Sequence, residues 1–488
     1  MTVGHVIPFG EWLPDLPAHQ NPGALIARNV IPEVGGYRSL NSPEAFTNAL
    51  ASACLGTFWL QASDGTVYTF AGTSTGLHRL TDVTWNDVSG SSAPYNAVEW
   101  EFTKFGDRVI AANIGDPLQA FDIGTDTVFK DLPGGPPQAA RIATVRDFVV
   151  IGDIAGLGPH WVQWCGFNNS EIWTPSLATQ SDRSELFGRG GRVMRIVPGE
   201  YGVIFQEHSI TRMDYTGPPV IFQIDEVERK RGTPAPGSVL WTGRHVFFFG
   251  WDGFYHFDGR GTESISHNRV SRWFERNVDG AAFTKMRGAV DRVNRLLIWA
   301  FSSDESSPFN NRLLIYNWAA NRWSYAEVDT EIIDEYVSPG YTLDELDLVL
   351  GNIDDNSISV DSTAYQGGDI NMQVFTPEHR TATFSGEPLP ATIDTKEISS
   401  QRGTGLFCNA VEPQVESNEN PTIRIRVGMR RRLADVPSFT TARAVNGING
   451  EVNVRVNSRY MRFRAEIAGR FEHATGVLAH IADRRARR

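Results

Sequence analysis

The stretch VFFFGWDGFYHFDG at residues 246–259 is typical of a β-hairpin. Two apolar runs, VFFFG and FYHFDG, flank a turn whose glycine supplies the positive φ that tight turns require. The first run is almost wholly apolar, which indicates a strand covered on both faces by neighbouring sheets. A fold in which successive hairpin units stack against one another would provide that cover.

The same pairing of two short apolar runs recurs along the chain. The first run of each of the six pairs begins near Phe58, Val109, Phe148, Val203, Val246 and Leu296. The intervals are 39 to 55 residues, about 48 on average, and a four-stranded propeller blade takes roughly 40 to 50 residues. Further β-like runs precede or follow most pairs, which gives up to four strands per unit. The alternative is a set of β-sandwiches without circular closure.

We therefore predict an all-β fold built on a six- or seven-bladed β-propeller. A seventh unit, LDLVLGN then SISVDSTAY, begins near Leu348 and keeps the interval. Residues 1–50 show little periodicity and many Pro and Gly, so we expect an extended N-terminal arm before a propeller at 51–385. From 386 to 488, strands such as TIRIRVGM alternate apolar with polar residues, which predicts a small C-terminal β domain. The last residues, IADRRARR, are expected to form a solvated basic tail.

Charge is distributed unevenly along the 488 residues. The net charge is −12, but residues 401–488 hold 16 Arg and 8 Asp or Glu, whereas residues 1–400 carry a balance of −20. Such asymmetry can mark a region that binds an acidic partner, while the acidic bulk argues against a protein that wraps nucleic acid with most of its surface. Arg greatly outnumbers Lys, which fits either interface use of the guanidinium group or a genome rich in G and C.

No pattern in the sequence points to catalysis, a metal or a cofactor. Cys54, Cys165 and Cys408 are far apart and form neither a disulfide framework nor a metal cluster. No nucleophile elbow, phosphate-binding loop or dinucleotide fingerprint is present. Glycosidase chemistry needs two suitably spaced carboxyl groups, and residues such as Asp252 and Asp258 qualify by type alone. We expect no enzyme activity, and no apolar run approaches the roughly 18 residues needed to span a bilayer.

Two basic clusters are candidates for contacts with a partner. EVERKRG at 226–232 contains Arg229, Lys230 and Arg231, and it predicts either a charged hairpin or loop, or a site that touches a phosphate or a partner carboxylate. MRRRL contains Arg430, Arg431 and Arg432. Adjacent residues on a strand point to alternate faces, so these three cannot form one patch. A salt-bridge site between subunits is at least as plausible there as nucleic-acid binding.

Three stretches together resemble the packaged-DNA stabilisation, or tail-hub, proteins of short-tailed phages. The first is FGEWLPDLPAHQNPGALIARNVIPEVGGYRSL at 9–40. The second is EYGVIFQEHSITRMDYTGPPVIFQIDEVERKRGTPAPGSV at 200–239. The third is DGFYHFDG at 252–259 with LLIYNWAANRWSYAE at 313–327. The last hundred residues resemble the family more weakly.

The resemblance implies a non-enzymatic virion protein, assembled in the host cytoplasm, that forms a homo-oligomeric ring of six copies in the tail. Such a ring lies below the portal and adaptor, extends the double-stranded DNA channel without reading sequence, retains the packaged genome and carries fibres, spikes or a needle. Trp12, Arg28 and Tyr37 in the first stretch join the two basic clusters as candidate interface residues. A phage receptor-binding or carbohydrate-processing propeller is the alternative.

Overall fold

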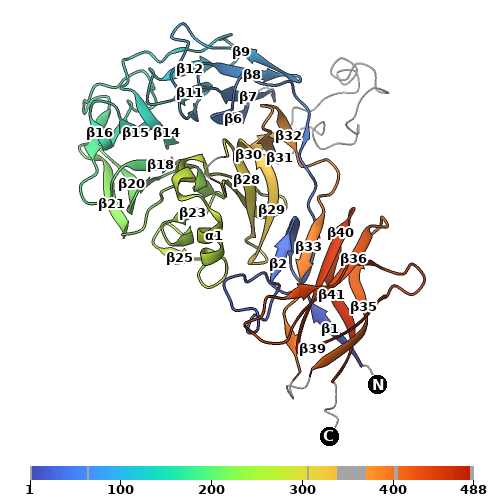
Figure 1. Cartoon of the computed structure of the whole chain (residues 1–488). Helices are drawn as coiled ribbons and strands as arrows, with labels where there is room; N and C mark the ends of the chain where they lie inside the picture. Colours follow the sequence, from blue (N-terminus) through green and yellow to red (C-terminus); the bar gives the residue numbers. More distant parts are fainter. Residues whose placement is uncertain (1–2, 63–64, 305–306, 338–369, 401–404, 484–488) are drawn as a thin grey trace.

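The computed structural model of the chain describes residues 3–62, 65–304, 307–337, 370–400 and 405–483. Figure 1 shows two parts, a ring of radially arranged sheets and a β-sandwich beside it that holds both chain ends. The ring is a β-propeller, as the sequence predicted, and the described residues form seven blades of four antiparallel strands each. Six blades are separate four-stranded sheets, and the sixth is part of a larger sheet.

Each blade runs outward from an innermost strand near the axis of the ring. From the inside out, the first blade is β6 (Gly56–Gln61), β7 (Val67–Gly72), β8 (Leu77–Thr81) and β9 (Thr84–Asp87), the second is β10 (Glu101–Phe105), β11 (Arg108–Ala112), β12 (Gln119–Asp122) and β13 (Lys130–Asp131), and the third is β14 (Ala139–Val145), β15 (Phe148–Ile154), β16 (Gly158–Trp164) and β17 (Asp182–Glu185). The fourth blade is β18 (Val193–Val197), β19 (Gly202–Gln206), β20 (Ser209–Gly217) and β21 (Ile221–Arg229), and the fifth is β22 (Leu240–Trp241), β23 (Val246–Gly250), β24 (Gly253–Phe257) and β25 (Thr262–Ser264). The sixth blade is β26 (Arg287–Asp291), β27 (Leu296–Phe301), β28 (Asn310–Asn317) and β29 (Arg322–Thr330), and the seventh is β30 (Ile332–Val337), β31 (Ile370–Phe375), β32 (Thr381–Thr383) and β5 (Glu44–Ala45).

The ring closes, because β30 of the seventh blade packs against both β26 of the sixth and β6 of the first. The alternative of unclosed sandwiches is therefore wrong. Second strands such as β15, β23 and β27 are buried along their whole length, as strands between stacked blades must be. Short helices η1 (Pro236–Ser238), α1 (Ser271–Asn277) and η2 (Gly280–Lys285) lie in the connections before and after the fifth blade.

The seventh blade is built from other segments of the chain than the sequence predicted. The segment beginning near Leu348 lies outside the described residues, and β30, β31 and β32 supply three of the strands. The fourth and outermost strand is β5 from the N-terminal segment, where Glu44 pairs with Thr383 and Ala45 with Ala382. Distant parts of the chain thus close the propeller together.

The segment at residues 1–50, which the sequence indicated as an extended arm, forms short strands in the chain's own sheets. β1 (Val3–Pro8) pairs with β41 (His473–Asp483), and β3 (Val30–Glu33) pairs with β4 (Gly36–Ser39). β2 (Ile26–Arg28) pairs with β29 on one side and with β33 (Ala391–Asp394) on the other. Open sheet edges offer unpaired backbone N–H and C=O groups, and the N-terminal segment satisfies them.

The C-terminal part is a sandwich of two sheets. One sheet contains β1, β3, β4 and β41 together with β35 (Leu406–Glu416) and β39 (Val452–Ser458). The other contains β33, β34 (Ile398–Ser399), β36 (Thr422–Arg430), β37 (Ser438–Phe439), β38 (Arg443–Ala444) and β40 (Tyr460–Ala468). Because β2 joins β29 to β33, the sixth blade and this second sheet form one continuous sheet of eleven strands. The main-chain link fixes the propeller to the sandwich.

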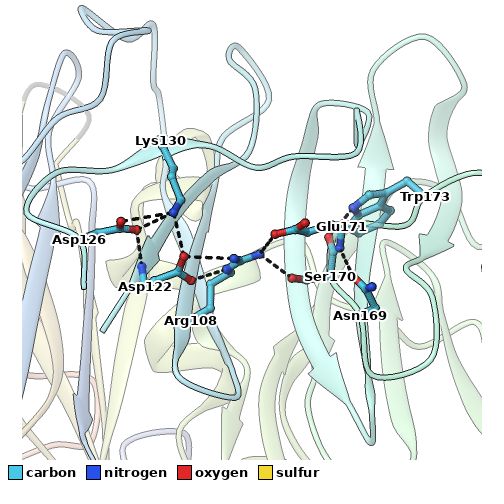
Figure 2. A network of polar contacts seen from close by, with 8 residues as sticks. All are labelled: Arg108, Asp122, Asp126, Lys130, Asn169, Ser170, Glu171 and Trp173. Atoms are coloured by element: carbon cyan, nitrogen blue, oxygen red, sulfur yellow. Dashed lines mark hydrogen bonds and ion pairs between the residues drawn. The ribbon is translucent and has the colours of Figure 1, made fainter. Parts of the chain in front are cut away.

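Polar contacts also tie the second blade to the third (Figure 2). Arg108 of the second blade forms two hydrogen bonds with Asp122, of 2.5 and 3.1 Å. Its other nitrogen reaches Glu171 at 2.8 Å and Ser170 at 3.1 Å, in the loop between β16 and β17 of the third blade. Lys130 donates to the same Asp122 at 2.8 Å. One guanidinium group therefore spans the boundary between two blades.

Candidate functional site: the propeller channel

The axis of the propeller contains two cavities that share part of their lining. One, of about 490 Å³, is lined by residues of all seven innermost strands or the segments beside them. The other, of about 690 Å³, lies where the loops around Cys54, Lys285, Phe309 and His379 surround the axis. We call the first the lower channel and the second the vestibule. Glu99, Arg287 and Ile332 line both cavities, so they lie at the boundary between the two.

Five charged side chains form a network at this boundary, which we call the channel plug: Glu99, Glu101, Arg141, Arg195 and Arg287. Arg141 donates to Glu99 and to Glu101, both at 2.8 Å. Arg195 donates to Glu101 at 2.8 Å, and Arg287 lies 2.9 Å from Glu99. The residues come from the second, third, fourth and sixth blades, so circular closure of the ring is what brings them together.

The plug is electrostatically compensated despite its burial. Burial alone would raise the pKa of Glu99, but the guanidinium groups of Arg141 and Arg287 outweigh it and hold this pKa at about 2. Burial likewise opposes the charge of Arg141, yet Glu99 and Glu101 raise its pKa above the ordinary value. Groups desolvated in this way are strongly interdependent, because removing one partner leaves an uncompensated buried charge.

Two further carboxyl groups lie in the lower channel, on consecutive residues of β30. Asp334 accepts a hydrogen bond from Thr57 of the first blade, and burial raises its pKa. Glu335 lies 3.4 Å from Arg292 of the sixth blade, and burial raises its pKa to about 7. Consecutive strand residues face opposite sides, so these carboxyl groups contact different blades.

The vestibule has a mixed lining of charged and apolar groups. Glu331 accepts from His379 at 2.5 Å and from the backbone N–H of Cys54 at 3.0 Å. Arg192 lies 3.4 Å from Asp153, whose pKa is raised by burial. Apolar side chains, among them those of Leu55 and Phe309, complete the wall. The vestibule therefore offers both ionic and apolar contacts to a bound molecule.

Two of the sequence-predicted interface residues are buried in the chain's own core. The Trp12 side chain is 1% exposed and packs edge-on against Trp273 of α1, with ring centroids 4.7 Å apart. Tyr37 is fully buried, and its hydroxyl donates to the carbonyl oxygen of Gly10 at 2.8 Å. The prediction that they contact a partner is wrong, because the N-terminal segment uses both aromatic rings to dock onto its own chain.

Arg28 and the first basic cluster are accessible to different degrees. Arg28 lies on β2, 3.2 Å from Glu327 of β29, and is half-exposed. Arg229 is exposed and bonds to Glu226 at 2.8 Å, and Arg231 donates to the hydroxyl of Thr262 at 2.7 Å. Lys230 between them adopts a φ of 70°. This cluster begins at the last residue of β21, the outermost strand of the fourth blade, and continues into the loop that follows.

The second basic cluster divides between inside and outside. Arg430 donates to Glu397 at 2.6 Å, and both side chains are largely buried in the sandwich domain. Arg431 and Arg432 are exposed, and Arg432 lies 2.9 Å from Asp435. Arg430 thus holds its own domain together, whereas Arg431 and Arg432 lie on the surface of the domain.

Sequence reasoning missed the channel plug, although a signal was present. Four of the runs that became innermost strands or lie beside them carry charged residues within an otherwise apolar context: VEWEF, RIATV, VMRIV and MRGAV. These runs contain Glu99 and Glu101, Arg141, Arg195 and Arg287. Charges that recur at the blade interval, with both signs represented, indicate a shared axial network.

Two negative findings concern the part of the chain that the structure describes. Within it, no group of three or more His, Cys, Asp or Glu side chains is placed to hold a metal ion. No helix among the described residues has the length and apolar character needed to cross a membrane.

Comparison with known proteins gives similarity in fold only. No family model matches the chain, and no curated protein matches it. Among solved structures it is similar to the extracellular domain of a one-component system protein from B. thetaiotaomicron, with 10% identity and a TM-score of 0.41, over 78% of this chain and 42% of that one. It is also similar to BBS1N in complex with ARL6DN, with 10% identity and a TM-score of 0.40, over 71% of this chain and 96% of that one. The chain spans less than half the length of the first of these proteins.

Proposed function

We propose that the protein is a structural component of a short phage tail. In this proposal several copies, six by the family resemblance, form a ring below the portal and adaptor in the virion. The ring extends the DNA channel, retains the packaged genome and carries fibres or spikes. Contacts between copies, rather than a catalytic centre, do the work.

The observation that carries this proposal is the continuous eleven-stranded sheet that joins the sixth blade to the sandwich through β2. A ring under load from packaged DNA needs subunits whose two parts cannot hinge freely, and main-chain pairing through β2 supplies that stiffness. Heterologous contacts between one part of a copy and another part of the next generate a closed ring when the rotation from copy to copy closes. The segment 9–40, which carries part of the family resemblance, contains β2, β3 and β4.

The channel plug bears on where DNA would pass. Because Glu99 and Arg287 lie between the two axial cavities of each propeller, the DNA path would run along the ring axis between copies and not through a propeller. The balance of −20 in residues 1–400 would repel phosphate and allow a duplex to slide, with an effect that weakens as salt rises.

Electron microscopy of the purified full-length protein tests the proposal. We expect closed rings, formed by the protein alone or after addition of the portal adaptor. A protein that stays monomeric under both conditions would contradict it. Sedimentation of the same samples gives the number of copies independently of image classification.

The second candidate is a carbohydrate-binding or carbohydrate-processing propeller, favoured by the raised pKa values of Asp334 and Glu335 in the lower channel. Glycosidases use a carboxyl group with a raised pKa beside a second one. However, Asp334 and Glu335 face different blades, so one sugar ring cannot easily lie between them. Cleavage of a glycan by the monomer, lost in Glu335→Gln, would establish this candidate over the first.

A further inference from the structure

The vestibule contains buried polar atoms that the protein itself leaves unpaired. Arg141 and Asn310 both line it, and their residues are 6% and 1% exposed. Nε of Arg141 and Oδ1 of Asn310 are buried and form no hydrogen bond with any atom of the described residues. Native proteins pair nearly all such atoms with protein, water or a ligand. One donor and one acceptor are therefore available beside this cavity.

The vestibule also differs in charge from the rest of the propeller. Four cationic side chains line it, those of Arg141, Arg192, Lys285 and Arg287, against three carboxyl groups, those of Glu99, Asp153 and Glu331. One of these carboxyl groups, Glu331, is engaged by His379. Residues 1–400 as a whole carry a net charge of −20. The lining of this cavity, in which cationic side chains outnumber carboxyl groups, therefore has the opposite sign of charge.

Arg192 and Lys285 are available to a ligand at the mouth of the vestibule. The Arg192 side chain is 55% exposed, and its ion pair with Asp153 is long, at 3.4 Å. Lys285 is exposed, and its Nζ donates to the carbonyl oxygen of Ser307 at 3.2 Å. Both groups keep N–H donors free for an anion. The volume of about 690 Å³ suits a small organic molecule, for which pockets of roughly 300 to 1,000 Å³ are usual.

We propose that the vestibule binds a carboxylate whose neighbouring atoms carry a hydroxyl or amide N–H. The carboxylate would accept from Arg192 and Lys285, and the adjacent donor would meet Oδ1 of Asn310. The apolar wall around Leu55 and Phe309 would cover the body of the ligand. A peptide C-terminus and a uronic acid of a bacterial polysaccharide both present this chemistry. The vestibule lies within a single copy of the chain, so this proposal does not depend on assembly of several copies into the oligomeric ring of the proposed function.

Titration calorimetry of the full-length protein with two matched pairs of probes tests the site. The pairs are N-acetylphenylalanine with its amide, and glucuronic acid with glucose. We expect millimolar or tighter binding of at least one acid and no binding of its neutral partner. Binding of only the first acid identifies a peptide end, and binding of only the second identifies an acidic sugar. If neither acid binds, or if acid and neutral partner bind equally, the proposal is overturned.

Variants locate the binding within the molecule. Arg192→Gln should weaken binding of the acid about tenfold, which corresponds to about 1.4 kcal/mol, and Lys285→Gln should act in the same direction. Arg229→Gln is the control, because it removes an exposed arginine from the outer edge of the fourth blade, away from the vestibule, and should leave affinity unchanged. An Arg192→Gln protein that folds normally and binds as tightly as the parent would refute the assignment.

Discussion

A guanidinium nitrogen of Arg141 lies 2.8 Å from a carboxylate oxygen of Glu99, and both side chains are largely buried on the axis of the propeller. Removing one partner of a buried ion pair leaves an uncompensated charge and costs about 3–5 kcal/mol. We therefore predict that Glu99→Gln lowers the free energy of unfolding by that amount at neutral pH. Urea denaturation followed by tryptophan fluorescence measures it.

A matched control is Glu171→Gln, which removes a carboxylate from a pair with Arg108 between the second and third blades. Glu171 is 45% exposed, and such pairs contribute about 0–1 kcal/mol. Equal losses of unfolding free energy in the two variants would show that the axial network stabilises the protein no more than this half-exposed pair does.

The same glutamate predicts a pH dependence. The pKa of Glu99 is about 2 against an ordinary 4.5, so the stability that the ionised Glu99 contributes is complete above pH 4.5 and disappears as the pH falls through 2.

Glu335 should give the opposite pH dependence. Burial raises its pKa from 4.5 to about 7, so the native state favours the protonated form. The stability that this preference adds is complete below pH 4.5 and is lost as the pH rises through 7. We expect wild-type stability to fall on the order of 1–3 kcal/mol across this interval relative to Glu335→Gln. If the free energies of unfolding of the two proteins change with pH by the same amount from pH 4.5 to 8, the assignment is contradicted.

The sequence was sufficient to predict the propeller fold but not the charged network at its axis. The blade interval and the apolar runs were enough to predict a propeller, because burial between stacked blades imposes a pattern on every second strand. The plug was not predicted, because Glu99 and Arg287 are far apart in sequence and meet only when the ring closes. A pattern of single charges within apolar runs becomes meaningful once closure is assumed.

The interface residues illustrate a different limit. Trp12 and Tyr37 have the residue types that protein interfaces favour, yet the same types are used when a segment docks onto its own chain. The sequence of residues 1–50 shows no long period because β1, β2, β3, β4 and β5 are short strands added to other sheets. Local patterns identify strands that pair with sequence neighbours, and they do not identify the partner of an isolated strand.

Trp12 provides a direct test of this docking. Its indole is 1% exposed and lies 5.0 Å from the Tyr325 ring, measured between centroids, as well as against Trp273. Replacing a buried large aromatic side chain by alanine costs about 3–5 kcal/mol, so Trp12→Ala should destabilise the protein by that amount. Trp251→Ala is the control, since Trp251 is 56% exposed and exposed substitutions usually stay within about 0.5 kcal/mol. A small effect at Trp12 would mean that the segment docks weakly.

The three thiols should be unreactive in the folded protein. Cys54, Cys165 and Cys408 are free and buried, and burial raises the pKa of both Cys165 and Cys408 to about 12. Because the thiolate is the reacting species, we expect no reaction with a disulfide reagent at pH 8 in the native state. Three equivalents should react in urea. Reaction of a thiol before unfolding would identify a region that opens locally.

The N-terminal strands predict the outcome of truncation. β5 closes the seventh blade and β2 joins the sixth blade to the sandwich, so deletion of residues 1–46 should expose β32 and separate the two parts. We expect loss of a single cooperative unfolding transition and rapid amide hydrogen exchange in β32 and β33. Deletion of residues 1–8 is the control, because it removes only β1, which pairs only with β41 among the described strands, and it should leave exchange in the propeller unchanged. A fully folded protein lacking residues 1–46 would mean that the segment is an accessory arm after all, and its contribution would then be sought in contacts between copies.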